Sequence, residues 1–148
     1  MVLATNPWGP LMPNDTAVVR YVNPPALERP PGYSHIVDVR GSRLIFIAGQ
    51  ASVDATGTVV GGDNVEAQAE QAFRNLSAAL ESVGCTASNL VKLTVFVRDM
   101  GRLADYRRAR DRFFNSVTPA AAPAVTLVEV SRLYSERLLI EIEGVAAA

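Results

Sequence analysis

The sequence is poor in the residues on which disulfide bonds and metal sites depend. It contains one cysteine, Cys85, and one histidine, His35, in 148 residues. A single cysteine cannot form a disulfide bond within the chain, which is typical of a protein from a reducing compartment. Because histidines and cysteines do not occur as a cluster, the sequence supports no metal site.

Excess charge and long apolar runs are also missing. The net charge of −1 and the isoelectric point of about 5.8 give no electrostatic reason to bind a nucleic acid. The arginine-rich stretch 98–112 is interleaved with aspartates, which is typical of a solvated helix face. No apolar run approaches the length of a membrane span, and the N-terminus lacks the features of a secretory signal. We therefore expect a cytoplasmic protein.

Prolines divide the chain into two parts. Seven of the nine prolines fall within residues 1–31, and each fixes φ and removes a backbone hydrogen-bond donor. This stretch is therefore predicted to be an extended N-terminal arm, with room for one short edge strand at 17–22. Residues 32–148 are predicted to form a single domain with its own core, since 49% of the chain is hydrophobic.

Two segments are predicted to fold as β-hairpins. Residues 34–50 contain two β-branched and aromatic runs around a turn at 40–42. Residues 123–145 contain two further β-prone runs around a longer polar turn, and the second run carries Glu141 and Glu143 between aliphatic residues. The two strands of each segment are expected to pair with each other.

Two helices and one strand are predicted between these hairpins. Apolar residues recur at helical spacing after Asp63, which is expected to form a capping box with Glu66, and Gly84 stands where a left-handed C-cap belongs. Residues 90–97 are predicted to form a strand with apolar side chains on both faces. A second helix is expected over 103–114.

The resulting order, ββαβαββ, predicts an α+β fold with two helices on one face of a sheet. Two helices can cover only one face, whereas the strand at 90–97 is apolar on both. An uncovered apolar sheet face would be a large exposed patch, so we expect the protein to associate with itself through this face.

Six stretches, in this order, resemble the YjgF/RidA (Rid) family, some of whose members have been called ribonucleases or translation inhibitors. They cover most of residues 32–148 and are Gly32–Val37, Leu44–Gln50, Val65–Gly84, Val91–Met100, Phe113–Phe114 and Pro123–Glu143. The resemblance implies a chorismate-mutase-like (RidA-like) fold and a homotrimer whose sheets line a central barrel. It also implies small-molecule clefts between subunits, hydrolysis of reactive enamines and imines to ketoacids and ammonia, and no need for a metal or organic cofactor.

The resemblance assigns catalytic and cleft residues one by one. The family's catalytic-site glutamate corresponds to Glu141, and its cleft tyrosine corresponds to Tyr33. The cleft backbone around the second family strand corresponds to Ala48 and Gly49. Glu141 is expected to position or deprotonate water, and Tyr33 to orient the substrate through its hydroxyl. The alternatives are that Glu141 is a solvated strand residue and that Tyr33 is an aromatic residue packed at the rim of a subunit boundary.

The chain departs from the family at the residue that holds the substrate carboxylate. The arginine expected after Pro-Ala is Val125 here, and the family's cysteine position holds Leu127. A carboxylate in a partly dry cleft is best bound by a bidentate guanidinium, and valine has neither charge nor donor. Loss of such an anchor costs about 3 kcal/mol or more. The usual 2-iminoacid deaminase activity is therefore not expected.

Two arginines of the second predicted helix are candidates for a replacement anchor. Arg110 falls inside the apolar stripe and Arg107 at its edge, where the family often has a tyrosine and an asparagine. A charge in such a place must be paired or must reach an opening. Either one of these arginines binds an anion in the cleft, or it pairs with a local carboxylate such as Asp111 or Glu129.

The predicted function is that of a Rid-like hydrolase or deaminase acting on a small reactive imine, enamine or related metabolite. A Rid homologue that binds a small ligand or a partner without catalysis is the alternative, which the valine at position 125 favours. A ribonuclease or translation inhibitor is the third possibility, although no aromatic stacking platform accompanies the arginines.

Overall fold

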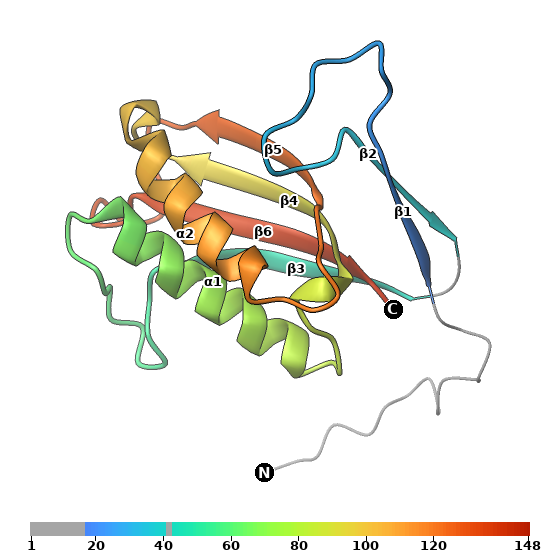
Figure 1. Cartoon of the computed structure of the whole chain (residues 1–148). Coiled ribbons are helices and arrows are strands. Elements are labelled where there is room, and N and C mark those ends of the chain that lie inside the picture. The colour runs from blue at the N-terminus through green and yellow to red at the C-terminus, as the bar shows by residue number, and fades with distance from the viewer. Residues whose placement is uncertain (1–16, 41–42) are drawn as a thin grey trace.

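The computed structural model describes residues 17–40 and 43–148. Figure 1 shows an α+β chain in which the order ββαβαββ follows one additional N-terminal strand, so the predicted class and order are confirmed. The elements are β1 (Val18–Val22), β2 (Ile36–Arg40), β3 (Leu44–Ala51), α1 (Val65–Glu81), β4 (Leu90–Val97), α2 (Leu103–Asn115), β5 (Ala124–Glu129) and β6 (Ile140–Ala147). Most of the predicted arm, and residues 41–42 of the predicted turn, lie outside the described residues.

The strands form two sheets. Strands β3, β6, β4 and β5 make a four-stranded sheet in that order, and both helices pack on one face of it (Figure 1). Strand β4 lies between β6, which is antiparallel to it, and β5, which is parallel to it. Strands β1 and β2 form a separate two-stranded antiparallel sheet, so the short strand expected at 17–22 is present and pairs with the start of the domain.

Both predicted hairpin pairings are wrong. Strand β2 pairs with β1, and β3 pairs with β6, instead of with each other. Strands β5 and β6 lie on either side of β4, because helix α2 returns the chain parallel to β4 and the segment 130–139 then crosses the end of that strand. The crossing is held by the Val130 amide, which donates to the Val97 carbonyl at 2.8 Å. Adjacent β-prone runs therefore predicted strands correctly but not their partners.

The hydrophobic core fills the space between the four-stranded sheet and the two helices. Its fully buried side chains include Leu93, Val95 and Ile142 from the sheet, Leu76 and Leu80 from α1, and Tyr106 from α2. Burial of one such aliphatic side chain stabilises the fold by about 1.5–3 kcal/mol. The core thus fixes which face of the four-stranded sheet the helices cover.

The opposite face of the four-stranded sheet, which we call the open face, has no covering element among the described residues. It bears Phe46, whose side chain lies beside Ala48, Lys92 and Thr94. Phe46 is 77% exposed and the neighbouring Leu44 is 54% exposed. The uncovered sheet face expected from the sequence is therefore present in the single chain.

Helix α1 begins one residue later than the predicted capping box. Its N-cap is Asn64, whose side-chain oxygen accepts a hydrogen bond from the Ala67 amide at 2.9 Å. Glu66 does not close a box with Asp63, because its carboxylate bonds to arginines of α2 instead. The predicted left-handed glycine is confirmed, since Gly84 has a φ of +74° just after the helix.

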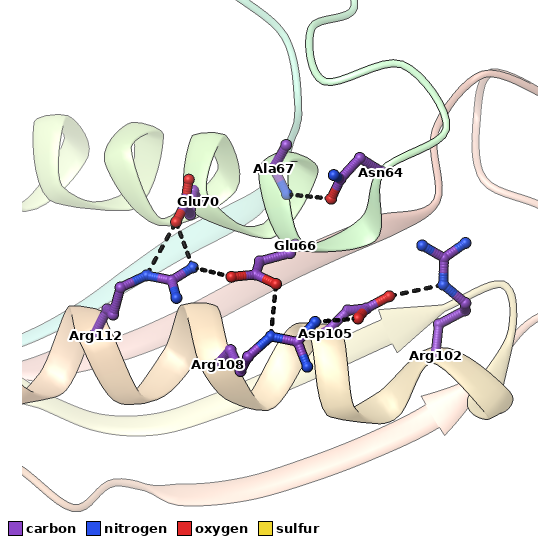
Figure 2. Close-up of polar contacts among 8 residues, drawn as sticks. All are labelled: Asn64, Glu66, Ala67, Glu70, Arg102, Asp105, Arg108 and Arg112. Carbon is purple, nitrogen blue, oxygen red and sulfur yellow. Dashed lines mark hydrogen bonds and ion pairs between the residues drawn. The ribbon is translucent and has the colours of Figure 1, made fainter.

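A chain of ion pairs joins the solvent sides of the two helices (Figure 2). Its carboxylates and guanidinium groups alternate, and they belong to Glu66, Glu70, Asp105, Arg102, Arg108 and Arg112. Glu66 accepts from both Arg108, at 2.7 Å, and Arg112, at 2.5 Å. Two hydrogen bonds lower the pKa of Glu66, and the one from Arg112 has a larger effect than the one from Arg108. The pKa of Asp105 is also lowered, mainly by the hydrogen bond from Arg102.

We predict that Glu66→Gln makes the melting temperature of the protein less sensitive to acid. A carboxylate whose pKa is lowered by folding stabilises the native state above its unfolded-state pKa, and this contribution is lost as the pH falls through the folded-state value. The melting temperature of the wild type should therefore fall on acidification below the ordinary glutamate pKa of 4.5, and that of the variant should fall less. Thermal unfolding followed by circular dichroism between about pH 7 and about pH 3 measures this.

The matched control is Glu81→Gln, which removes an exposed glutamate at the other end of α1. The difference in melting temperature between Glu66→Gln and this control should be present at neutral pH and should shrink at high salt, because exposed ion pairs are screened. If Glu66→Gln and Glu81→Gln unfold alike at every pH, the ion-pair chain does not stabilise the helix pair.

Candidate functional site

Five of the predicted site residues line one cavity between α2, β5 and the turn before β2, which we call the α2–β5 cavity. These are Tyr33, Arg107, Arg110, Val125 and Leu127, and the cavity has a volume of about 210 Å³. Val125 and Leu127 supply an apolar wall, and the two arginines come from successive turns of α2. Residues from distant parts of the chain thus line one cavity.

Arg110 is the buried cation of the α2–β5 cavity. Its exposed fraction is 8%, as its place in the apolar stripe predicted. Its Nε and Nη2 atoms donate to Oδ1 of Asp111 at 3.0 and 2.8 Å, so Asp111 rather than Glu129 is its local partner. The guanidinium carbon lies 5.9 Å from the centre of the Tyr106 ring, a distance that allows a cation–π contact.

Gly32 gives the Arg110 guanidinium room. Its φ of +79° is a left-handed conformation that favours glycine. A Cβ atom at this position would lie only 2.7 Å from Nη2 of Arg110. The glycine backbone therefore lies directly on the guanidinium, and the absence of a side chain is what permits the contact.

Among the described residues that line the cavity, none is acidic. Arg107 is exposed and has no hydrogen-bond or ion-pair partner among the described residues. Tyr106 also lines the cavity, and within the described part of the chain its buried hydroxyl has no hydrogen-bond partner. Burial raises the pKa of Tyr106 to about 12, so this hydroxyl stays neutral at physiological pH. Sequence reasoning missed Tyr106 as a site residue, although its spacing of four from Arg110 places both on one helix face.

Tyr33 is positioned by the turn that contains His35. The His35 amide donates to Asn23 at 2.9 Å, and its Nε2 lies 2.6 Å from the Glu28 carbonyl. The Tyr33 and His35 rings meet edge to face at 5.7 Å. This single histidine therefore ties the turn to the segment before it, which is a structural role.

The other predicted site residues gather where β3 and β6 pair. The register shifts between Ile47 and Gln50, so Ala48 and Gly49 form an irregularity of the bulge type. A Cβ atom on Gly49 would lie 2.0 Å from Oε1 of Glu141, which means that the Glu141 carboxylate rests on the glycine backbone. Glu141 is half-buried and has no hydrogen-bond or ion-pair partner in the described part of the chain.

Within one chain these two groups lie on opposite faces of the sheet. Val125 and Leu127 pair in register with Leu93 and Val95, whose side chains are buried under the helices. Glu141 pairs with Phe96, which alternates with those residues along β4 and so points to the open face. Because residues in register share a face, Glu141 cannot reach the α2–β5 cavity of its own chain.

The described ranges, 17–40 and 43–148, lack two kinds of feature. These ranges contain no group of three or more histidine, cysteine or acidic residues arranged to hold a metal ion. Neither helix has the length and hydropathy needed to cross a membrane.

Comparison with known proteins places the chain in a family. The family model described as Endoribonuclease L-PSP matches residues 25–148, almost all of the described chain. The crystal structure of YyfB from Yersinia pestis, a protein of unknown function in the conserved Rid family, has a TM-score of 0.79 at 32% identity and covers 88% of this chain and 98% of that one. The chain belongs to the YjgF/RidA (Rid) family. The resemblance seen in the sequence, and the RidA-like fold that it implied, are confirmed.

Two further relatives of this Rid protein carry names that bear on chemistry. The 2-iminobutanoate/2-iminopropanoate deaminase of Salmonella typhimurium is 38% identical over 104 residues, which are 70% of this chain and 78% of the relative. The crystal structure of Escherichia coli TdcF with bound serine has a TM-score of 0.66 at 30% identity, and it covers 82% of this chain and 91% of that one. These relatives link the family to imine deamination and to small-molecule binding.

We predict that Gly49→Ala displaces the Glu141 carboxylate with little loss of stability. Gly49 is not in the left-handed region, and the clashing atom is the free end of a flexible side chain, so the cost should be about 1 kcal/mol or less. A crystal structure of the variant would show Glu141 in another rotamer, and denaturant unfolding would measure the cost.

The matched control for this prediction is Gly144→Ala, on the partner strand β6. There a Cβ atom would meet Leu90, Leu76 and Leu93 in the core at 3.1–3.5 Å. Overpacking of this kind costs about 1–3 kcal/mol. An unchanged Glu141 rotamer in Gly49→Ala would contradict the contact on which this half of the site is built.

Proposed function

We propose that this Rid protein hydrolyses a small reactive imine, enamine or related electrophile. The observation that carries the proposal is the Glu141 carboxylate, which is half-buried, unpaired among the described residues and seated on the bulge at Gly49. A carboxylate held in this way is free to accept a proton from water and to return it. The deaminase activity named for a relative at 38% identity supports the same reaction class.

The proposed reaction requires one proton carrier and no redox partner. Glu141 takes a proton from water while the oxygen bonds to the electrophilic carbon of the imine, and it then returns this proton to the nitrogen, which gives a carbinolamine. Collapse of the carbinolamine then forms the carbonyl, breaks the carbon–nitrogen bond and releases ammonia. An enamine enters the same sequence once its carbon is protonated to give the imine. Tyr33 would orient the substrate through its hydroxyl.

We further propose that the working unit is a homotrimer with sites between subunits. Glu141 lies on the open face and the α2–β5 cavity on the helix face, so only a second chain can bring both groups to one ligand. The open face bears the highly exposed Phe46, whose burial against another chain would be favourable. The trimer is the assembly that the family resemblance implies.

A non-catalytic Rid homologue that binds a small ligand or a partner is the second candidate function. The observation that favours it is Val125, which lines the cavity without offering a charge or a hydrogen-bond donor. A ribonuclease gains no support from the arginines of α2, because Arg102, Arg108 and Arg112 are engaged by carboxylates of the same helix pair.

The catalytic proposal is tested by ammonia release from imines that an amino-acid oxidase generates in the assay. We expect turnover of at least one acidic, aromatic or neutral imine, and Glu141→Gln should lower it by about 10²–10⁴-fold because the amide cannot accept a proton. Glu143→Gln is the matched control, since it changes an exposed glutamate two residues along the same strand, and it should stay within a few-fold of the wild type.

Two results would count against this reading. Equal turnover in Glu141→Gln and the wild type would remove Glu141 from the mechanism. Absence of turnover across the whole imine panel, with a folded protein, would favour the non-catalytic homologue.

The assembly proposal predicts that Phe46→Glu separates the subunits. A charge at the centre of a buried apolar interface is costly, so the variant should sediment as a folded monomer while the wild type sediments as a trimer. Tyr134→Glu is the control, because Tyr134 is 71% exposed but lies in the loop between β5 and β6 rather than on the open face. A wild type that sediments as a monomer at micromolar concentration would contradict the proposal.

A further inference from the structure

A groove lies between the solvent-facing sides of α1 and α2, and we call it the interhelix groove. It consists of two adjoining cavities with volumes of about 540 and 330 Å³, and both are lined by Ser77, Glu81 and Phe113. The first cavity lies between the two helices, and the second extends to the chain that follows each of them, at 86–88 and 116–118. The groove borders a different side of α2 from the α2–β5 cavity and shares no lining residue with it.

The floor of the interhelix groove is aromatic. The rings of Phe73 and Phe113 stack there, with their centres 4.5 Å apart and their planes at 19°. Phe113 is half-buried and lines both cavities, so part of its ring is accessible from the groove. Aromatic-lined grooves bind proline-rich segments in the polyproline II conformation, which has no internal hydrogen bonds to lose.

The charges at the edge of the interhelix groove balance one another. Glu70 forms an ion pair with Arg112. Arg74 and Glu81 add one further charge of each sign. A groove without net charge has no electrostatic preference for a charged partner, and a charged side chain would lose hydration on entering it. The fitting occupant is therefore an uncharged and largely apolar segment.

The N-terminal arm contains a segment of this kind. Residues 1–16 lie outside the described part of the chain, and the first fourteen of them have no charged side chain. Prolines recur there at every third position, at Pro7, Pro10 and Pro13. Because a polyproline II helix has three residues per turn, this spacing predicts that the prolines share one edge of such a helix and that Trp8 and Leu11 share another.

The described chain begins close to one end of the interhelix groove. Val18, the first residue of β1, pairs with Arg40. Three residues after Arg40, the Nη2 atom of Arg43 donates a hydrogen bond to the Val83 carbonyl at 2.9 Å. Val83 lies just after α1 and just before the residues at 86–88 that line the second cavity. Figure 1 shows the start of β1 at the same end of the molecule as the end of α1.

The segment also has the length that the groove requires. Residues 7–13 would span about 19 Å in a polyproline II helix, at about 3.1 Å per residue. The part of α1 that lines the groove, from Glu70 to Glu81, is about 17 Å long at about 1.5 Å per residue. The connection from Trp8 to Ala17 spans about 30 Å when it is extended, which is enough to place Trp8 in the groove.

We propose that residues 7–13 of this chain dock in its own interhelix groove, with Trp8 and Leu11 packed against the ring of Phe113. The contact covers the aromatic floor and fastens the arm, and with it the start of β1, to both helices. The interhelix groove is then a docking site for a proline-rich segment, a role separate from those of Glu141 and the α2–β5 cavity.

The test is the fluorescence of Trp8 in the full-length protein, because Trp8 is the single tryptophan of the chain. Docked Trp8 should emit at a shorter wavelength than it does in guanidinium chloride, and acrylamide should quench it less. Quenching falls as the docked fraction rises. We therefore expect a quenching constant at least about threefold lower than in the unfolded chain, which corresponds to docking in about two thirds of the molecules.

Two variants block the groove without changing the arm. Ser77 is half-buried and lines both cavities, so the carboxylate of Ser77→Glu would have to lose water when the arm docks. This variant should have the emission wavelength and quenching constant of an exposed tryptophan, while its circular dichroism stays that of the wild type. Ala78→Glu, at an exposed position of the same groove, should act in the same direction.

Ala104→Glu is the matched control for these variants. It adds the same charge at an exposed position of α2 that lines neither cavity of the groove, so Trp8 should stay as protected as in the wild type. Phe46→Glu, which is expected to separate the subunits, decides which chain's arm fills the groove. Docking within one chain predicts that Trp8 stays protected in that folded monomer.

Three results would overturn the proposal. Trp8 of the folded wild type could be quenched as strongly as in the unfolded chain, which would mean that the arm does not dock. Equal protection in the wild type and in both groove variants would mean that Trp8 packs elsewhere. Loss of protection in monomeric Phe46→Glu would mean that the groove binds the arm of a neighbouring copy instead of its own.

Discussion

The alternation of side chains along β4 is the constraint on which the rest of the structure depends. Leu93 and Val95 are buried under the two helices, so the residues between them point to the open face. Because paired residues on neighbouring strands share a face, the side chains of β5 and β6 are divided between the same two faces. One consequence is a packed core on one side and an exposed apolar surface on the other. A second is that the two groups of candidate functional residues are separated within a single chain, which makes association with another chain a chemical requirement of the proposed reaction.

Glycine backbones seat the charged group at both halves of the candidate site. Arg110 lies against Gly32 and Glu141 lies against Gly49, and in each case a Cβ atom would overlap the charged side chain. The two glycines act in different ways, since Gly32 also adopts a left-handed φ whereas Gly49 lies where β3 changes register. In both arrangements a glycine backbone packs against the charged side chain. Glu141 has no countercharge among the described residues, whereas Arg110 is paired with Asp111.

Helix α2 uses its arginines for two purposes. On the side that faces α1, Arg108 and Arg112 are matched by Glu66 and Glu70, and this side contributes to holding the helices together. On the side that faces β5, Arg110 has only its sequence neighbour Asp111, and Arg107 has no partner among the described residues. The helix is therefore close to neutral where it packs on α1 and positive where it borders the cavity. The net charge of the whole chain, −1, gives no sign of this difference in charge between the two sides of α2.

The element order, the extent of α2, the left-handed Gly84 and the burial of Arg110 could be predicted from the sequence, because each follows from periodicity or from the conformational preference of a single residue. The family resemblance added the grouping of Tyr33 with Val125 and Leu127. The pairing of the strands, the capping of α1 by Asn64 rather than Asp63, and the bonds from Glu66 to α2 became clear only from the folded chain. The same is true of the contact between Gly32 and Arg110 and of the position of Glu141 on the opposite face from the cavity. These features depend on contacts between residues far apart in the chain, and neighbouring β-prone runs carry no information about such contacts.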